Sequence, residues 1–261
     1  MSNLKETKEE EVNAPNEKSS PQHKDRVIRR LLKDPKRALE VCQAVTGEDY
    51  PEDAQVKLYD LENSILKRYN DVAVGIDDQV LFMIEHSSSI SNNFPLRLFS
   101  YIHDVWFGWF VEVDQLYKEK QYKIPEPKFY VLYNGEKPLK QTKLKLSDAF
   151  QTSDGSDQKF ALELEVTIID VNHSSDNPVL KRSKSLGEYA YLVDRIRKGM
   201  RQGLNRDKAI RDAIAHCIEV NVLTDFLKTN YEEVAKMLVW EYNQEAEFKA
   251  IRTDGFEQGI E

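Results

Sequence analysis

The sequence predicts a mixed α/β fold with a helical C-terminal region, and three observations support this prediction. Short alternating apolar runs, which are typical of strands, lie in the first two thirds of the chain. One long helical pattern separates these runs, and the last third contains only helical patterns. The resulting order of helix, strands, helix, strands and helices favours a central mixed sheet flanked by helices.

Length and composition favour one globular unit with appendages. The chain has 261 residues, of which 40% are hydrophobic and 31% are charged, so it can bury a sizeable core. No apolar run reaches the length of about 18 residues that a transmembrane helix needs, and we therefore expect no membrane partner. The only cysteines are Cys42 and Cys217, each in a helical pattern. They are too few for a disulfide framework or a zinc site, which favours a reducing, cytoplasmic location.

The chain divides into three predicted segments. Residues 1–24 are rich in Glu, Lys, Asn, Ser and Pro and lack the apolar core of a signal peptide, so they predict a disordered tail. Residues 25–180 contain all the strand patterns and form the expected central domain. Residues 181–261 form the expected helical region, which would pack on that domain.

Basic side chains gather on two predicted helices, although the net charge of −8 argues against bulk attraction to nucleic acid. The first group is Arg26, Arg29, Arg30, Lys33, Lys36 and Arg37, and the second is Arg195, Arg197, Lys198, Arg201, Arg206, Lys208 and Arg211. Either group could face a phosphate backbone. The alternative is that both are solvated helix faces whose charges are balanced by nearby acids.

The first predicted elements are a divided helix and a short strand. Asp25 could cap a helix that runs to about Thr46, where Gly47 would end it. Pro35 would divide this helix in two, because proline disrupts a helix interior. Residues 56–59 then alternate between apolar and polar side chains and predict a strand.

Two apolar runs joined by a polar turn predict a β-hairpin. The first run covers residues 71–76, the second covers residues 80–86, and Asp77-Asp78 lies in the turn. After a polar loop, Pro95 suits the first turn of a long helix. We expect the broad aromatic face of this helix to pack across the sheet, with both tryptophans in the core: Leu96, Leu98, Phe99, Ile102, Val105, Trp106, Trp109, Phe110 and Val113.

The rest of the chain predicts two more strands and then helices. A buried strand is expected over residues 128–135, where it ends in a turn, and an alternating strand over residues 162–171. The later patterns are helical and cover residues 186–200, 206–218, 223–227 and 231–248.

The hairpin carries one acid on each strand. Asp71 begins the first strand and Glu85 lies near the end of the second, so the turn could bring both carboxylates to one edge of the sheet. Carboxylates in this arrangement can bind a hard cation such as Mg²⁺ or Mn²⁺, which neutralises charge in phosphodiester hydrolysis. The carbonyl of His86 could add a third ligand. Ser87 shares a strand face with Glu85 and could orient the attacking water, although a longer side chain would reach further.

Each of these positions also has a simpler explanation. Acids at strand ends are common surface residues, and His86 could be a hydrogen-bonded structural histidine. Arg97 begins the next helix and could reach a phosphate, or it could form a salt bridge instead. The residues alone leave these alternatives open.

Several longer motifs occur along the chain in a defined order. They are Tyr69-Asn70-Asp71-Val72, Ile84-Glu85-His86-Ser87-Ser88, Asn93-Phe94-Pro95-Leu96-Arg97, Pro127-Lys128-Phe129-Tyr130-Val131-Leu132-Tyr133-Asn134-Gly135, Leu146-Ser147-Asp148-Ala149-Phe150, Leu186-Gly187-Glu188-Tyr189-Ala190, Glu241-Tyr242-Asn243 and Asp254-Gly255-Phe256-Glu257-Gln258-Gly259. From about Lys24 to the C-terminus, this series resembles the recombination-promoting nuclease family, whose members are also described as transposase-like. That family belongs to the PD-(D/E)XK nuclease superfamily.

The resemblance implies a PD-(D/E)XK core, similar to restriction endonucleases, over residues 25–180. It also implies a Mg²⁺-dependent DNA endonuclease, intracellular and linked to DNA recombination, with Asp71 and Glu85 as metal-binding acids. Two positions depart from the family pattern. Ser87 stands where a glutamine is usual, and Lys36 stands where an acid is common in the first helix. Glu40, one turn further along the same helical face, could replace that acid.

The departure at Ser87 creates an alternative function. Loss of one group that positions the nucleophile costs on the order of 10² to 10³ in rate. The alternative is therefore a weakened or inactive family member that binds DNA or a protein without cutting. A purely structural interaction module is a third hypothesis, and a homo-oligomer is left open.

Overall fold

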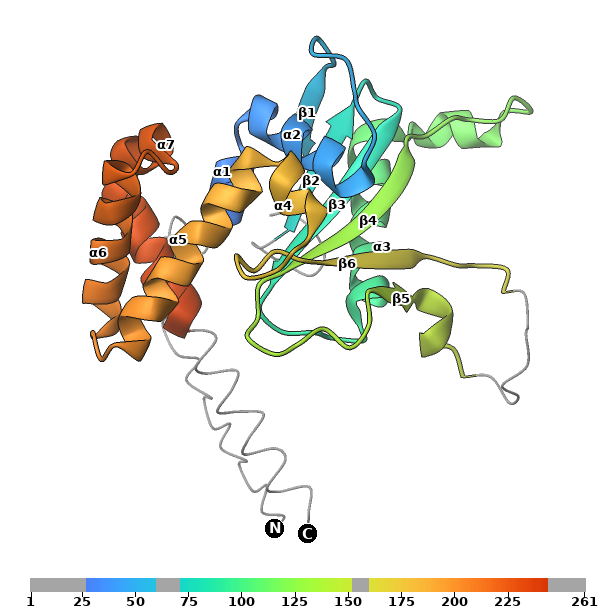
Figure 1. The fold of residues 1–261 in the computed structure, drawn as a ribbon. Coiled ribbons are helices and arrows are strands. Elements are labelled where there is room, and N and C mark those ends of the chain that lie inside the picture. Colours follow the sequence, from blue (N-terminus) through green and yellow to red (C-terminus); the bar gives the residue numbers. More distant parts are fainter. Residues whose placement is uncertain (1–26, 60–70, 152–159, 244–261) are drawn as a thin grey trace, which may run out of the picture.

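The structure is a computed structural model that describes residues 27–59, 71–151 and 160–243 (Figure 1). The predicted N-terminal tail, the motif at residues 254–259 and the end of the last predicted helix lie outside these residues. Among the described segments, none of the helices combines the length and apolarity required to cross a membrane.

Six strands form one mixed sheet in the order β1-β2-β3-β4-β6-β5. The strands are β1 (Val56–Tyr59), β2 (Asp71–Ile76), β3 (Val80–Ser87), β4 (Glu126–Tyr133), β5 (Lys143–Lys145) and β6 (Glu165–Asp170). The first three pair antiparallel, β4 and β6 continue parallel to β3, and β5 pairs antiparallel with β6. The sheet and its flanking helices confirm the predicted α/β class.

The turn between β2 and β3 confirms the predicted hairpin. Asp77 and Asp78 both have left-handed backbone angles, with φ of 52° and 53°. Two consecutive residues of this kind match the right-handed twist of a hairpin, and aspartate tolerates the conformation better than most side chains. Contacts to the neighbouring strand region hold the turn: the Gln55 amide donates to Asp77 at 2.8 Å, and Lys57 Nζ lies 2.8 Å from Asp78.

Helices cover both faces of the sheet (Figure 1). The α5 face, as we call it, packs against α1 (Val27–Leu32), α2 (Pro35–Thr46) and α5 (Lys184–Arg201), while α6 (Arg206–Glu219) packs on α5 and α7 (Thr224–Thr229) packs on α6. The other face, the α3 face, packs against α3 (Phe94–Val105). Because β3 lies between these layers, every residue from 81 to 86 is buried.

The N-terminal helical region is two helices, as the proline predicted. Asp34 caps α2 by accepting from the Lys36 amide at 2.9 Å, and Pro35 occupies the first turn. Gly47 ends α2 with φ of 75°, as expected for a left-handed C-cap. The predicted cap residue Asp25 lies outside the described residues.

The long helix expected from Pro95 is shorter than predicted. α3 ends at Val105, and the chain continues as a π-helical turn, η2 (Trp106–Phe110), and a 3₁₀ turn, η3 (Val113–Tyr117). Gly108 weakens a helix at this point, because glycine costs roughly 1 kcal/mol relative to alanine. The prediction that both tryptophans lie in the core is wrong for Trp109, which is 60% exposed.

Three further short elements were not predicted. They are β5, the 3₁₀ turn η4 (Leu146–Ala149) and the helix α4 (Pro178–Arg182), each of five residues or fewer. The strand expected over residues 162–171 begins later, at Glu165. The final helix is described over residues 231–243 and agrees with the prediction there.

Candidate functional site

The hairpin register brings the two predicted acidic positions together. Asp71 pairs directly with Glu85 across the antiparallel strands β2 and β3. Directly paired residues of this kind have Cα atoms about 4.5–5.5 Å apart. On its other side, Glu85 pairs with Val131 of the parallel strand β4. The predicted site therefore lies at the end of the sheet where the inner strand β2 begins and the inner strand β3 ends.

Glu85 is a buried carboxylate that is paired with an arginine. Its side chain is only 3% exposed, and Arg97 of α3, which is 20% exposed, forms an ion pair with it. The Arg97 guanidinium also lies 5.1 Å from the centre of the Phe94 ring. A carboxylate so deeply buried requires a partner charge. The salt-bridge alternative for Arg97 is thus what the structure shows, and its phosphate contact stays a prediction.

Ser87 shares the α3 face with Glu85, but its hydroxyl has local partners. Ser87 Oγ donates to the Ser89 carbonyl at 2.8 Å and accepts from the Ser89 amide at 3.3 Å. This is a short turn closed by a serine side chain. The hydroxyl that was expected to orient water is therefore engaged in the loop that follows β3.

His86 points to the opposite face of the sheet, because successive residues in a strand alternate. Its ring is 2% exposed, and Nε2 lies 3.2 Å from the Tyr189 hydroxyl of α5. The hydrogen-bonded structural role, which the sequence left as one alternative for the His86 side chain, is therefore what the structure shows. A role for the His86 carbonyl as a metal ligand stays a prediction.

Glu40 is not brought to Glu85. It lies on α2, on the α5 face, and its carboxylate accepts from Ser183 Oγ at 2.7 Å and from the Ser185 amide at 2.8 Å. These donors belong to the N-terminus of α5, where free amides and the helix dipole attract a carboxylate. The placement supports a structural cap and gives no support to the catalytic role expected for Glu40.

The basic helices also favour their simpler explanation. On the first, Arg30 pairs with Glu233 at 3.3 Å. On the later ones, Lys198 pairs with Asp194 at 2.6 Å, and Arg211 pairs with Asp207 at 3.1 Å. These charges are balanced by acids of the same or neighbouring helices.

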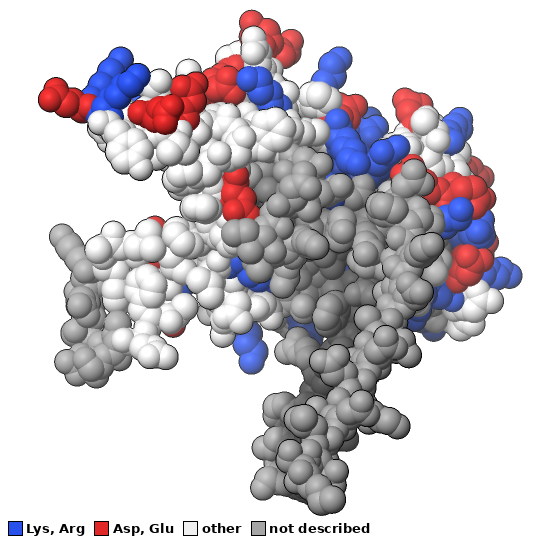
Figure 2. Space-filling view, turned by 180° about the vertical axis from the view of Figure 1, so that it is seen from behind, with Lys and Arg blue, Asp and Glu red and all other residues white. Residues whose placement is uncertain are grey.

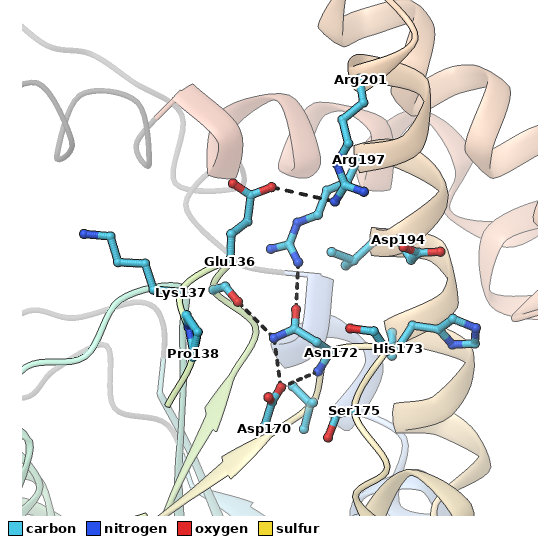
Figure 3. Close-up of a pocket in the computed structure, with 15 residues that line it drawn as sticks. Glu136, Lys137, Pro138, Asp170, Asn172, His173, Ser175, Asp194, Arg197 and Arg201 are labelled. Carbon is cyan, nitrogen blue, oxygen red and sulfur yellow. Dashed lines mark hydrogen bonds and ion pairs between the residues drawn. The ribbon is translucent and has the colours of Figure 1, made fainter. Parts of the chain in front are cut away.

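A polar cavity of about 300 Å³ lies where β4 and β6 end against α5 (Figure 3). At its base, Arg197 donates to Asn172 Oδ1 at 2.7 Å, and Asn172 Nδ2 donates to Asp170 at 2.8 Å and to the Gly135 carbonyl at 2.9 Å. Arg197 also donates to the Asn134 carbonyl. The network ties both strand ends to the helix.

This network was missed by sequence reasoning, which treated Arg197 only as part of a basic helix. A signal was present, since Asn134-Gly135 and Asp170-Val171-Asn172 both follow apolar strand patterns. Asn134 Nδ2 also lies 3.5 Å from the Tyr189 hydroxyl, which extends the network to His86. Polar residues that end neighbouring parallel strands meet at one edge of a sheet, so their proximity could have been expected.

Comparisons of the chain with protein-family models, with curated proteins and with solved structures found no match. Within the described residues, no group of three or more His, Cys, Asp and Glu side chains is arranged to hold a metal ion. The geometry at Glu85 and the ordered motifs are therefore the features of the chain that bear on its function.

Proposed function

We propose that the protein is a Mg²⁺-dependent DNA endonuclease of the recombination-promoting nuclease type, with a PD-(D/E)XK core. The observation that carries the proposal is the strand register that pairs Asp71 with Glu85, where β2 begins and β3 ends. A mixed sheet flanked by helices is also what the resemblance implies. DNA is the expected partner and substrate.

The donor set fits a magnesium ion. Mg²⁺ keeps several waters and is commonly held by one or two carboxylates together with substrate phosphate oxygens. Asp71 and Glu85 would supply two carboxylates from adjacent strands. When bound, the ion would stabilise charge on the phosphoryl group and favour deprotonation of water.

The remaining residues would position the reactants. Arg97 holds the buried Glu85 carboxylate and lies close enough to contact a phosphate that approaches it. Ser87 follows on the same strand face and would orient water only weakly, because its hydroxyl bonds to the Ser89 backbone.

Plasmid nicking with Mg²⁺ or Mn²⁺ tests the proposal. Asp71→Asn and Glu85→Gln should each lower the cleavage rate at least about 10³-fold, since each removes a charged ligand. The matched control is Glu165→Gln, which alters an exposed carboxylate on the distant strand β6. Equal residual cleavage in the wild type and both site variants would reject the nuclease.

A second candidate is a weakened or inactive family member that binds DNA or a protein. The engagement of the short Ser87 side chain by Ser89 favours it. In that case Ser87→Gln should raise cleavage on the order of 10²-fold, because it restores a side chain that reaches water. Ser88→Gln is the control, since residue 88 follows the end of β3. Strong cleavage by the wild type would exclude this candidate.

A further inference from the structure

The segment between α3 and β4, residues 106–125, exposes an unusual amount of apolar surface. We call it the arm, and Figure 1 shows it projecting from the sheet. Of the eleven large hydrophobic side chains that are exposed in the described part of the chain, six lie here: Phe107, Trp109, Val113, Leu116, Tyr117 and Ile124. Tyr117 is 87% exposed. Exposed apolar surface concentrated in this way marks an interaction site.

Specific contacts hold the arm in its conformation. Trp106 Nε1 donates to the Pro125 carbonyl at 3.3 Å, which joins the two ends of the arm. Tyr122 donates to the Phe110 carbonyl at 2.7 Å. Tyr59 of the edge strand β1 packs edge-on against Trp109, with ring centres 5.5 Å apart. Because the outward side chains are presented on an anchored segment, little ordering is needed before it binds a partner.

The exposed apolar area matches one half of a dimer interface. A fully buried aromatic side chain accounts for roughly 150–250 Å², so the exposed parts of the six side chains present on the order of 500 Å². A standard interface buries about 800 Å² on each partner, and about 65% of a homodimer interface is apolar. The arm therefore supplies about the apolar surface that one subunit needs.

The charges of the arm favour a second copy over a nucleic acid. The exposed acids are Glu112, Asp114 and Glu119, and the exposed lysines are Lys118, Lys120 and Lys123. Figure 2 shows both signs interspersed on the projecting part at the upper left. A nucleic-acid surface requires an excess of positive charge. A balanced set can pair with itself across a twofold axis, where each acid of one subunit meets a lysine of the other.

We propose that the arm is the interface of a homodimer, in which two arms pack against each other about a twofold axis. The apolar side chains form its centre, and the acids and lysines form its rim. The observation is independent of the chemistry at Glu85.

Sedimentation equilibrium of the full chain across a range of concentrations tests the interface. The wild type should dimerise, and Tyr117→Glu should weaken dimerisation at least about 100-fold, because a charge at the centre of an interface is left unpaired. Tyr117 is nearly fully exposed, so this variant should fold normally. Val220→Glu places the same charge at an exposed apolar residue beyond the end of α6 and should dimerise like the wild type.

Charge reversal gives a sharper test. One variant changes the three acids of the arm to lysine, and a second changes its three lysines to glutamate. Each alone should be monomeric, since like charges then face each other across the axis. An equimolar mixture should restore a dimer that contains one subunit of each kind.

Three results would overturn the proposal. One is a wild type that stays monomeric at about 100 μM, and another is a dimer that Tyr117→Glu leaves intact. The third is a monomeric wild type that binds single-stranded DNA, with this binding lost in Tyr117→Glu. That result would assign the aromatic surface of the arm to base stacking.

Discussion

The two faces of the sheet use neighbouring residues of β3 in different ways. On the α3 face, Glu85 forms an ion pair with Arg97 and stands opposite Asp71. On the α5 face, His86 joins a hydrogen-bonded network with Tyr189 that continues towards Arg197. One step along a strand therefore separates the proposed chemistry from a structural network.

The difference lies in what covers each face. Helices α1, α2 and α5 cover the α5 face, whereas α3 covers the other face, and on the α5 face His86 and Asn134 contact the Tyr189 hydroxyl of α5. Glu40 belongs to this face too, because it caps α5. The side chains that contact β3 therefore differ between the two faces: Tyr189 of helix α5 contacts His86, and Arg97 of helix α3 pairs with Glu85.

The largest effect is expected at Glu85. Glu85→Ala should abolish cleavage and lower the free energy of unfolding by about 3–5 kcal/mol, because Arg97 loses the buried charge that pairs with it. Urea denaturation and plasmid nicking measure the two effects. The double variant Glu85→Leu, Arg97→Met should recover much of the stability without recovering cleavage. If it cuts DNA, the α3 face is not the site.

Glu40 should show the opposite behaviour. Glu40→Ala removes a charged acceptor from Ser183 and Ser185 and should lower the free energy of unfolding by about 2–3 kcal/mol. Cleavage per folded molecule should be unchanged, as should both properties in the control Glu52→Ala, at an exposed position. A loss of cleavage in stably folded Glu40→Ala would show that Glu40 on the α5 face takes part in cleavage and is more than a structural cap.

A smaller effect is expected from the network behind β3. Tyr189→Phe removes the hydroxyl that lies near His86 and Asn134 and should cost about 1 kcal/mol of unfolding free energy. Chemical denaturation measures this cost, and the control Ser174→Ala, which removes a hydroxyl at an exposed position, should stay within about 0.5 kcal/mol of the wild type. A cost equal to that of the control would mean that the network contributes nothing to stability.

A separate effect on stability is expected at alkaline pH, at Tyr59 on the α3 face. Burial, together with the nearby Asp78 carboxylate, raises the pKa of Tyr59 to about 12 from an ordinary value near 10. Between these values the folded state holds the phenolic proton more tightly than the unfolded state. The contribution of Tyr59 to the free energy of unfolding is therefore fully present below about pH 10, and it is lost as the pH rises towards 12.

Urea denaturation at about pH 9 and pH 11 measures this loss. Tyr59→Phe should show a smaller fall in stability between the two pH values than the wild type. Equal falls would indicate that Tyr59 does not carry the effect. Because Tyr59 packs against Trp109, its ionisation should also change tryptophan fluorescence from the arm.

Much of the fold could be predicted from local patterns. The strands β1 and β2 begin and end where alternation predicted, and the break at Pro35 is present. The three-residue strand β5 is too short to produce a pattern, and the helical apolar pattern continues from α3 into residues 106–113, where only some of the side chains pack against the core. Periodicity shows that a residue could be buried, but burial also requires a neighbouring element.

The candidate site, like the fold, could be predicted only in part from the sequence. The sequence by itself determined the α/β class, the hairpin and the meeting of Asp71 with Glu85, because a tight turn sets the register of the strands that it joins. Only the tertiary structure decided that Arg97 pairs with Glu85, that Tyr189 meets His86 and that Glu40 caps α5. The physical reason is separation along the chain. Glu40 and Ser183 are 143 residues apart, and such contacts depend on how whole helices pack against the sheet.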